Sequence, residues 1–330
     1  MTRNQAPGRR AAVVLCVTAA LLGPGNPAGA SAGPPRGPGA LVYVADLHSD
    51  TVSVVDARTG GAVDAVPVGR GPDSVAVGPD GSRAYATDSA ADTVSVIDTR
   101  TRTVVATVPV GDEPSRVTVS PDGRRVYVAD VGSDDVSVID ARTLTVTDTI
   151  AVGDAPLGLA VTPDGGTLYV AAAGSGTVSV VRTDTGRVTG AIRVGAGPTA
   201  LVLTPDGRSL YVSNLSSDDV SVVDLRRGAE TDRIPVGKQP AGIGVRPDGR
   251  EVYVADLGSD TVSVVCTRAR AVTATVPVGH GPNGLAVAPD GSRVYVSDFD
   301  SDTLSVVDTS THRVRATVPV GDGPTGVAVF

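Results

Sequence analysis

The segment LVYVADLHSDTVSVVDARTGGAVDAVPVGRGPDSVAVGPDG, residues 41–81, decides the fold, because close copies of it follow at a constant interval. The tyrosines mark that interval, since each lies 42 residues after the one before: Tyr43, Tyr85, Tyr127, Tyr169, Tyr211, Tyr253 and Tyr295. No tyrosine lies outside this series. A fixed period in the forties is typical of a repeat architecture.

The composition agrees with an all-β repeat protein. The chain has 330 residues, of which 40 are Gly and 24 are Pro, so a helical bundle is unfavourable. Pro and Gly follow no three-residue period, which excludes a collagen. Hydrophobic residues make up 41% of the chain, which excludes a disordered chain.

Each repeat contains four short runs of strand length that are rich in β-branched residues. In the first repeat these runs are Leu41–Asp46, Thr51–Asp56, Ala62–Val68 and Ser74–Gly78. The repeats begin at Leu41, Arg83, Arg125, Thr167, Ser209, Glu251 and Arg293, without insertion or deletion. A Pro-Asp-Gly turn, first seen at 79–81, follows each fourth run except the last. This pattern predicts a seven-bladed β-propeller with four antiparallel strands per blade.

The position of each strand within a blade is also predictable. Proline recurs in the third run at Pro67, Pro109, Pro235, Pro277 and Pro319, and proline is excluded from central strands. The third run is therefore the outer edge, and the fourth run is the inner strand at the channel. The first repeat lacks a preceding fourth-type strand, whereas residues 325–330 form one. We expect this C-terminal strand to close the first blade.

The motifs Tyr-Val-(Ala/Ser)-(Asp/Asn), Val-Ser-Val-(Val/Ile)-Asp, Pro-Val-Gly-x-x-Pro and Pro-Asp-Gly resemble the repeat of the YVTN-family β-propellers. The resemblance covers residues 41–330 and recurs seven times. It implies an exported or surface propeller that is used for binding, with relatives among the seven-bladed lactonases and the streptogramin lyases. The repeat motifs carry no catalytic residue, so the resemblance says little about chemistry.

Residues 1–32 have the layout of a secretory signal peptide. Arg3, Arg9 and Arg10 precede the apolar run Ala11–Leu22, and small residues follow at 28–32. Twelve apolar residues are too few to span a membrane, so we expect cleavage and no transmembrane segment in the mature chain. Either the general or the twin-arginine export route is compatible with this segment. Residues 33–40 read as a Pro/Gly linker.

The chain is acidic, with a formal net charge of −8. Cleavage would remove three arginines and no acidic residue, so the mature chain is more acidic still. We therefore expect no nucleic-acid partner. Cys266 would be the single cysteine of the mature chain, which excludes an internal disulfide. It can be a reactive or intermolecular thiol or a half-buried residue at a strand end.

The most variable position of the repeat follows the Val-Gly pair, in the loop from the outer strand to the next inner strand. It holds Arg70, Asp112, Asp154, Ala196, Lys238, His280 and Asp322, and Glu113, Arg116 and Gln239 lie close by. Such loops converge at the channel mouth. We predict a ring that binds a small polar ligand or a polar segment of a partner protein, through Arg70, Asp112, Glu113, Asp154, Lys238, His280 and Asp322. The alternative is free variation at exposed loop tips.

Two acidic positions flank the turn between the first and second runs, at Asp46 and Asp50 in the first repeat. Calcium prefers such oxygen ligands but needs six or more of them. We interpret both positions as turn caps and expect no metal. The fourth repeat differs, with Ala172, Gly176 and Arg182 at positions where other repeats have acidic residues, and Arg193 at the proline position. This repeat either marks the side of the propeller that docks a partner or has drifted in sequence without a function.

The sequence shows no catalytic constellation. His48, His280 and His312 fall in three kinds of loop, and nothing supplies a further zinc ligand. We expect an extracytoplasmic, monomeric binding or scaffold module without a cofactor. Two alternatives remain: an enzyme resembling the propeller lactonases or lyases, and a structural surface-layer component.

Overall fold

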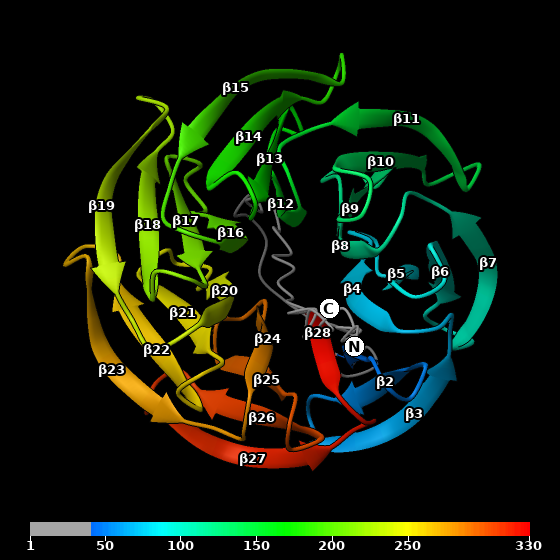
Figure 1. The fold of residues 1–330 in the computed structure, drawn as a ribbon. Coiled ribbons are helices and arrows are strands. Elements are labelled where there is room, and N and C mark those ends of the chain that lie inside the picture. The colour runs from blue at the N-terminus through cyan, green and yellow to red at the C-terminus, as the bar shows by residue number, and fades with distance from the viewer. Residues whose placement is uncertain (1–40) are drawn as a thin grey trace, which may run out of the picture.

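The computed structural model describes residues 41–330, so the predicted signal peptide (1–32) and linker (33–40) lie outside the described residues. The described chain forms 28 strands in seven four-stranded antiparallel sheets, which are arranged as a ring (Figure 1). Residues of the inner strands line a cavity at its centre, here called the channel. This confirms the predicted seven-bladed propeller. None of the described residues forms a helix long and apolar enough to span a membrane.

Seven inner strands surround the channel. They are β28 (Pro324–Val329), β4 (Pro72–Val77), β8 (Pro114–Val119), β12 (Pro156–Val161), β16 (Pro198–Leu203), β20 (Pro240–Val245) and β24 (Pro282–Val287). The tyrosine strands come next: β1 (Leu41–Asp46), β5 (Arg83–Asp88), β9 (Arg125–Asp130), β13 (Thr167–Ala172), β17 (Ser209–Asn214), β21 (Glu251–Asp256) and β25 (Arg293–Asp298).

The third strand of each blade carries the Val-Ser-Val motif. These strands are β2 (Thr51–Asp56), β6 (Thr93–Asp98), β10 (Asp135–Asp140), β14 (Thr177–Arg182), β18 (Asp219–Asp224), β22 (Thr261–Cys266) and β26 (Thr303–Asp308). The outer strands are β3 (Gly61–Pro67), β7 (Thr103–Pro109), β11 (Thr145–Ala151), β15 (Arg187–Arg193), β19 (Ala229–Pro235), β23 (Ala271–Pro277) and β27 (Arg313–Pro319).

The observed strand order confirms the order predicted from the prolines. Blade 1 is β28-β1-β2-β3, blade 2 is β4-β5-β6-β7, and the remaining blades follow in chain order up to blade 7, β24-β25-β26-β27. Blade 1 is closed by the C-terminal strand, since Tyr43 of β1 pairs with Ala328 of β28. The predicted third and fourth runs of the first repeat begin one and two residues too late, because Gly61 and Pro72 already belong to the strands.

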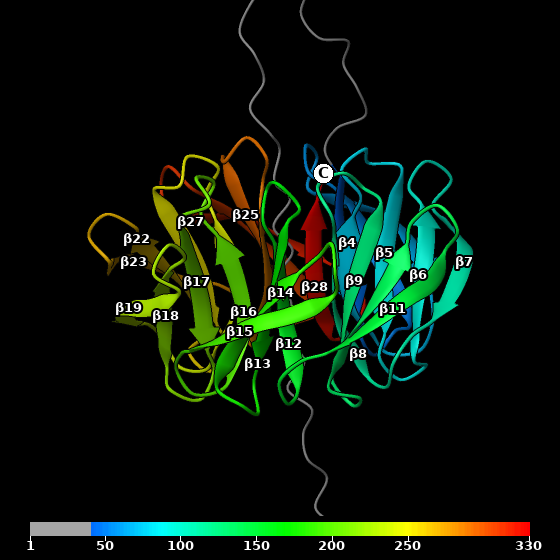
Figure 2. The same ribbon diagram turned by 90° about the horizontal axis from the view of Figure 1, so that it is seen from above.

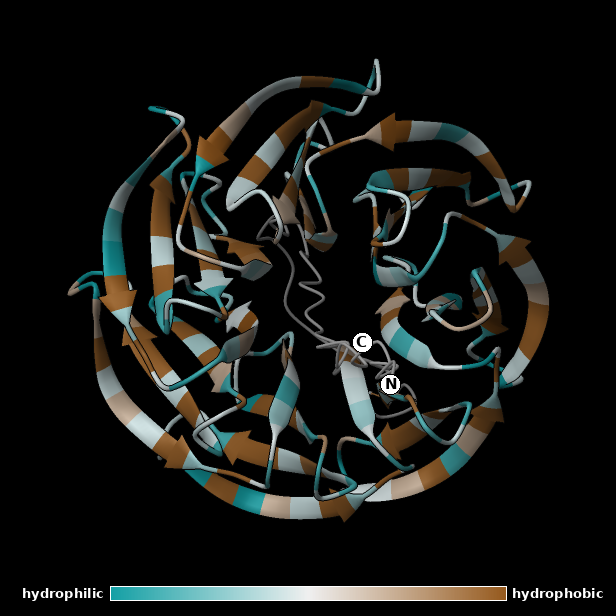
Figure 3. Ribbon diagram, viewed as in Figure 1, coloured by the Kyte–Doolittle hydropathy of each residue, from teal (hydrophilic) through white to brown (hydrophobic). Residues whose placement is uncertain are grey.

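The hydrophobic core consists of seven seams between neighbouring blades. At the first seam, Tyr43, Val52 and Val54 of blade 1 pack against Val75 and Ala84 of blade 2, and equivalent clusters fill the other six. The outer strands instead alternate between hydrophobic and hydrophilic residues, as Figure 3 shows along β3, β7 and β27. Each blade therefore depends on both neighbours to bury its two faces.

The ring has two different faces (Figure 2). The loop face carries the connections from each outer strand to the next inner strand and the turns from each tyrosine strand to the third strand. The turn face carries the Pro-Asp-Gly turns and the outer hairpins. Both assignments follow from hydrogen bonds within each face, such as His48 N to Asp322 O at 3.1 Å and Thr99 N to Ser82 O at 3.1 Å.

A buried carboxylate ends the tyrosine strand in five of the seven blades. In blade 1, Asp46 Oδ2 accepts hydrogen bonds from Ser53 Oγ at 2.7 Å, Thr51 Oγ1 at 2.9 Å and Ser53 N at 3.1 Å. Gly321, in the loop that enters this blade, lies so close that a Cβ atom there would come within 2.5 Å of Asp46 Cγ. The residue at the first acidic position therefore bonds the next strand of its own blade and packs against the loop that enters the blade. Our interpretation of this position as a turn cap was wrong.

Burial changes the pKa of the five aspartates at this position. Desolvation raises the pKa of Asp46, Asp88, Asp256 and Asp298 to about 6 and that of Asp130 to about 7, although the Ser and Thr hydroxyls oppose the change. Each carboxyl group binds its proton more tightly in the folded chain. Its contribution to stability is greatest below the ordinary pKa and is lost as the pH rises through the folded value.

We predict that Asp256→Asn stabilises the protein at neutral pH, because Asn stays neutral and Asn214 already fills this position in blade 5. The free energy of unfolding should match the parent near pH 4 and exceed it by about 2 kcal/mol near pH 8. Urea unfolding across this range measures the difference. Asp308→Asn is a control with the opposite sign, because Ser310 and Thr311 lower the pKa of Asp308 to about 2. This variant should be as stable as the parent at acidic pH and less stable than the parent at neutral pH. An Asp256→Asn advantage that does not grow with pH would contradict the prediction.

Candidate functional site

The structure places the predicted ring on the loop face, and every member is exposed: Arg70, Asp112, Asp154, Ala196, Lys238, His280 and Asp322. In each blade, the backbone carbonyl of this residue accepts a hydrogen bond from the turn that follows the tyrosine strand, as Arg70 O does from Ala90 N at 3.1 Å. The loops are thus fixed by backbone contacts while their side chains face solvent.

The side chains of the ring do not converge. Arg70 Nη2 donates to Ala90 O at 2.9 Å, His280 Nδ1 lies 2.9 Å from Asp260 Oδ2, and Asp322 Oδ1 lies 3.7 Å from His48 Nδ1. Other members use their backbone amides, which donate to a serine or aspartate of a neighbouring turn: Asp112, Glu113, Asp154 and Lys238. Among residues 41–330, no hydrogen bond or ion pair joins two side chains of the ring.

The second acidic position links neighbouring blades. Asp50 has a left-handed backbone, with φ of 55°, and its Oδ1 accepts a hydrogen bond from Gly71 N at 2.8 Å. Asp92, Asp134, Asp218, Asp260 and Asp302 make the equivalent bond. Asp46 and Asp50 therefore bind different partners. Within the described part of the chain, no group of three or more His, Cys, Asp or Glu side chains is placed to hold a metal ion.

A second set of polar residues lies deeper, at the loop-face ends of the inner strands. It consists of Asp73, Ser115, Arg116, Thr199, Asn283 and Thr325, all of which are buried. Thr325 Oγ1 donates to Ala45 O at 3.1 Å in its own blade and to Pro72 O at 3.3 Å in the next. Side chains at this level therefore lie where neighbouring inner strands meet.

Two of these residues carry charges, and they come from adjacent blades. Asp73, on β4, is 2% exposed, and Arg116, on β8, is 1% exposed. Burial raises the pKa of Asp73 to about 7, while the Arg116 guanidinium and the Ser115 hydroxyl act in the opposite direction. A carboxyl group whose pKa is raised toward neutrality suits the role of accepting and returning a proton.

The other repeats show that the fold needs neither charge. The position of Asp73 is occupied elsewhere by Ser115, Leu157, Thr199, Ala241, Asn283 and Thr325, and that of Arg116 by Ser74, Gly158, Ala200, Gly242, Gly284 and Gly326. Burying a charge is costly, and six sister blades avoid it at each position. Sequence reasoning missed Asp73 and named Arg116 only as a neighbour of the ring. Comparison of the inner-strand positions across the repeats would have found both.

The remaining predicted residues lie away from this cluster. Cys266 ends β22 and is half-buried, which confirms the expected strand-end position. His312 lies on the turn face, where its Nε2 atom is 3.3 Å from Glu251 Oε1 of the preceding blade. Arg193 ends the outer strand β15 of blade 4, and Arg182 pairs with Asp184 at the end of β14.

The chain forms a seven-bladed propeller, and a buried charged pair lies at the loop-face ends of two adjacent inner strands. Residues 35–194 and 227–329 match the model of the family described as "Lactonase, 7-bladed beta-propeller". The chain therefore belongs to the seven-bladed lactonase family. The YVTN repeat remains a resemblance of the motifs.

Solved structures share the architecture. Kuenenia stuttgartiensis hydrazine synthase is 26% identical, with 81% of this chain and 92% of that chain covered and a TM-score of 0.74. Putative 6-phosphogluconolactonases from Bacteroides uniformis and Bacteroides fragilis are 19% and 17% identical. Their TM-scores are 0.73 and 0.75, with 88% and 90% of this chain and 99% and 100% of those chains covered. A search of curated proteins found no significant match.

We predict that Asp260→Asn lowers the pKa of His280. The Asp260 carboxylate bonds the imidazole and is the main cause that raises this pKa above its ordinary value. NMR titration of the imidazole protons measures the change. Asp302→Asn is the matched control. Asp302 occupies the same turn position in the next blade and accepts the equivalent backbone hydrogen bond, from Gly323 N, whereas the bond to His280 is made by Asp260. Equal effects of the two substitutions would contradict the prediction.

Proposed function

We propose that this chain is an exported lactone hydrolase that acts at the loop-face end of its channel. The observation that carries the proposal is the Asp73–Arg116 pair, which two adjacent blades introduce into a ring where the sister positions are uncharged. Membership of the lactonase family supports the same activity. The proposed export rests on the signal-like residues 1–32. The mass of the chain recovered from culture medium tests it, because cleavage would remove this segment.

The proposed reaction uses the two charges in different roles. Asp73 accepts a proton from water as the water oxygen bonds to the lactone carbonyl carbon. The negative charge that forms on the carbonyl oxygen is stabilised by the Arg116 guanidinium. The ring C–O bond then breaks, Asp73 returns its proton to the departing alkoxide oxygen, and a hydroxy acid is released.

We predict that Asp73→Thr and Arg116→Ala each lower kcat/KM for a hydrolysed lactone by about 100-fold or more. Thr199 and Ala200 show that a blade accepts both residues at these positions. Each single variant leaves the other charge buried without its partner, which can destabilise the fold. The double variant Asp73→Thr/Arg116→Ala removes both charges, so it separates loss of activity from loss of folding. Asn283→Thr, at the Asp73 position of blade 7, is the matched control and should keep the activity.

The pH dependence provides a further readout of this prediction. Asp73 must be ionised to act as a base, so kcat/KM should fall as the pH drops below about 7. Asp73→Thr should remove this inflection from any residual activity. Activity that survives in the double variant within about twofold would overturn the assignment of these residues.

A binding module without catalysis is the second candidate, favoured by the exposed ring side chains that do not converge on one point. Such a module would recognise a small polar ligand or a partner's polar segment through the ring. The triple variant Arg70→Ala, Lys238→Ala, His280→Ala should then weaken binding of any ligand captured from culture medium by at least tenfold, as measured by calorimetry. Unchanged affinity would exclude the ring as the binding surface.

A further inference from the structure

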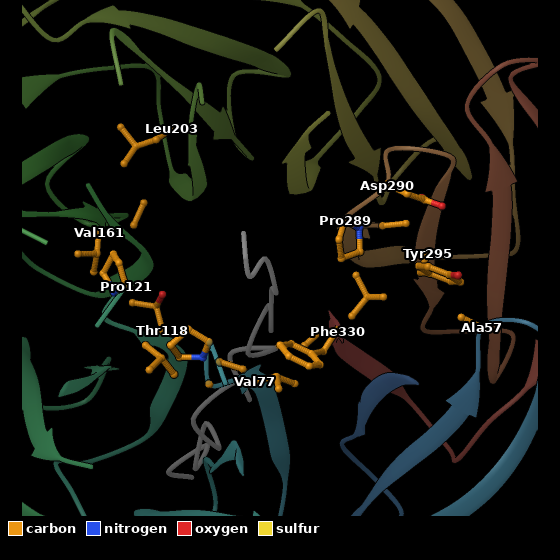
Figure 4. A pocket seen from close by; sticks show the side chains of 18 of the residues that line it. Ala57, Val77, Thr118, Pro121, Val161, Leu203, Pro289, Asp290, Tyr295 and Phe330 are labelled. Atoms are coloured by element: carbon orange, nitrogen blue, oxygen red, sulfur yellow. The ribbon is translucent and has the colours of Figure 1, made fainter. Parts of the chain in front are cut away.

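The channel has a second, apolar half at the turn face. A cavity of about 650 Å³ lies there, which is within the range of small-molecule sites. The inner-strand ends form much of its wall: Val77, Val119, Val161, Leu203, Val329 and Phe330. Figure 4 shows Val161, Pro121 and Thr118 on one side of the opening, with Pro289 across from them and Phe330 below Pro289.

The chemistry of this wall selects among ligands. Sugars and nucleotides need many polar partners or flat aromatic surfaces, and this wall offers mainly Val, Leu, Ala and Pro side chains. Of its two aromatic residues, Tyr295 is buried and Phe330 is partly exposed. Its charged residues are Arg58, from an outer hairpin, Asp290, from a Pro-Asp-Gly turn, and Arg293, at the start of β25. The cavity therefore fits an aliphatic chain.

The cavity lies further along the same two strands that carry the charged pair, and neither Asp73 nor Arg116 lines it. Thr118 lines it two residues after Arg116 on β8, and Ala76 lines it three residues after Asp73 on β4. At the rise of a β-strand these separations are roughly 7 and 10 Å. A molecule whose polar ring lies at the charged pair would extend its tail into the apolar half.

We infer that the substrate is an aliphatic lactone, whose ring lies at Asp73 and Arg116 and whose alkyl chain occupies the cavity at the turn face. The inference rests on the proposed lactone hydrolysis and adds the class of substrate. Each methylene moved from water into the cavity should tighten binding by about fourfold. The gain should end when the chain reaches the turn face.

The first experiment measures hydrolysis of γ-butyrolactone, γ-hexalactone, γ-octalactone and γ-decalactone by the full mature chain. We expect kcat/KM to rise with chain length by about fourfold per methylene and then level off. Val119→Phe narrows the cavity and should flatten this dependence. Val245→Phe is the matched control, because Val245 holds the same position on β20 but does not line the cavity.

The second experiment separates this inference from the proposed function. Calorimetry with decanol, which has the chain but no lactone, should show binding that Val119→Phe abolishes and Val245→Phe preserves. Decanol binding of this kind without hydrolysis of any lactone would overturn the proposed function and leave the aliphatic site standing. Lactone hydrolysis that is independent of chain length, without decanol binding, would overturn the aliphatic site and leave the hydrolase standing.

Discussion

The structure depends on a close contact between a glycine of the loop that enters each blade and the last residue of the tyrosine strand, which is a buried carboxylate in five of the seven blades. Asp88 shows the constraint: a Cβ atom on Gly69 would come within 2.4 Å of its Cγ atom. The missing side chain lets the loop from the previous blade lie directly on the end of the tyrosine strand. Gly69 N also donates to Ser95 Oγ at 3.2 Å, and Ser95 Oγ donates to Asp88 Oδ2 at 2.8 Å. This contact fixes both the spacing of the blades and the path of each loop.

Blades 4 and 5 show that geometry matters more than charge in this contact. Asn214 replaces the carboxylate in blade 5, and its amide bonds Asp219 and Ser221. In blade 4 the position holds Ala172, and a Cβ atom on Gly153 would still come within 2.8 Å of it. The glycine is present at every seam, whereas the carboxylate is present at five. The raised pKa values of the five aspartates are therefore a result of tight packing rather than a requirement of it.

The near-identity of the repeats makes each blade a control for the others. Asp73 and Arg116 stand out because six equivalent positions hold uncharged residues in the same backbone setting. Five of the seven inner strands also carry a polar or charged residue next to the proline at the loop face, and all seven end in Val or Leu at the turn face. The charged pair and the apolar cavity therefore lie toward opposite ends of the same inner strands.

The repeat, the number of blades, the strand order and the closure by β28 were all predictable from the amino-acid sequence. These follow from local patterns: alternating valines, Pro-Asp-Gly turns and prolines at the sheet edge. The tertiary structure was needed to show that Asp46 is buried against the entering loop and that Asp50 accepts a hydrogen bond from the loop to the next blade. It also showed that the exposed ring stays dispersed and that Asp73 lies near Arg116. The physical reason is that burial, pKa and neighbours across a seam depend on how two blades pack, and no pattern within one repeat contains that information.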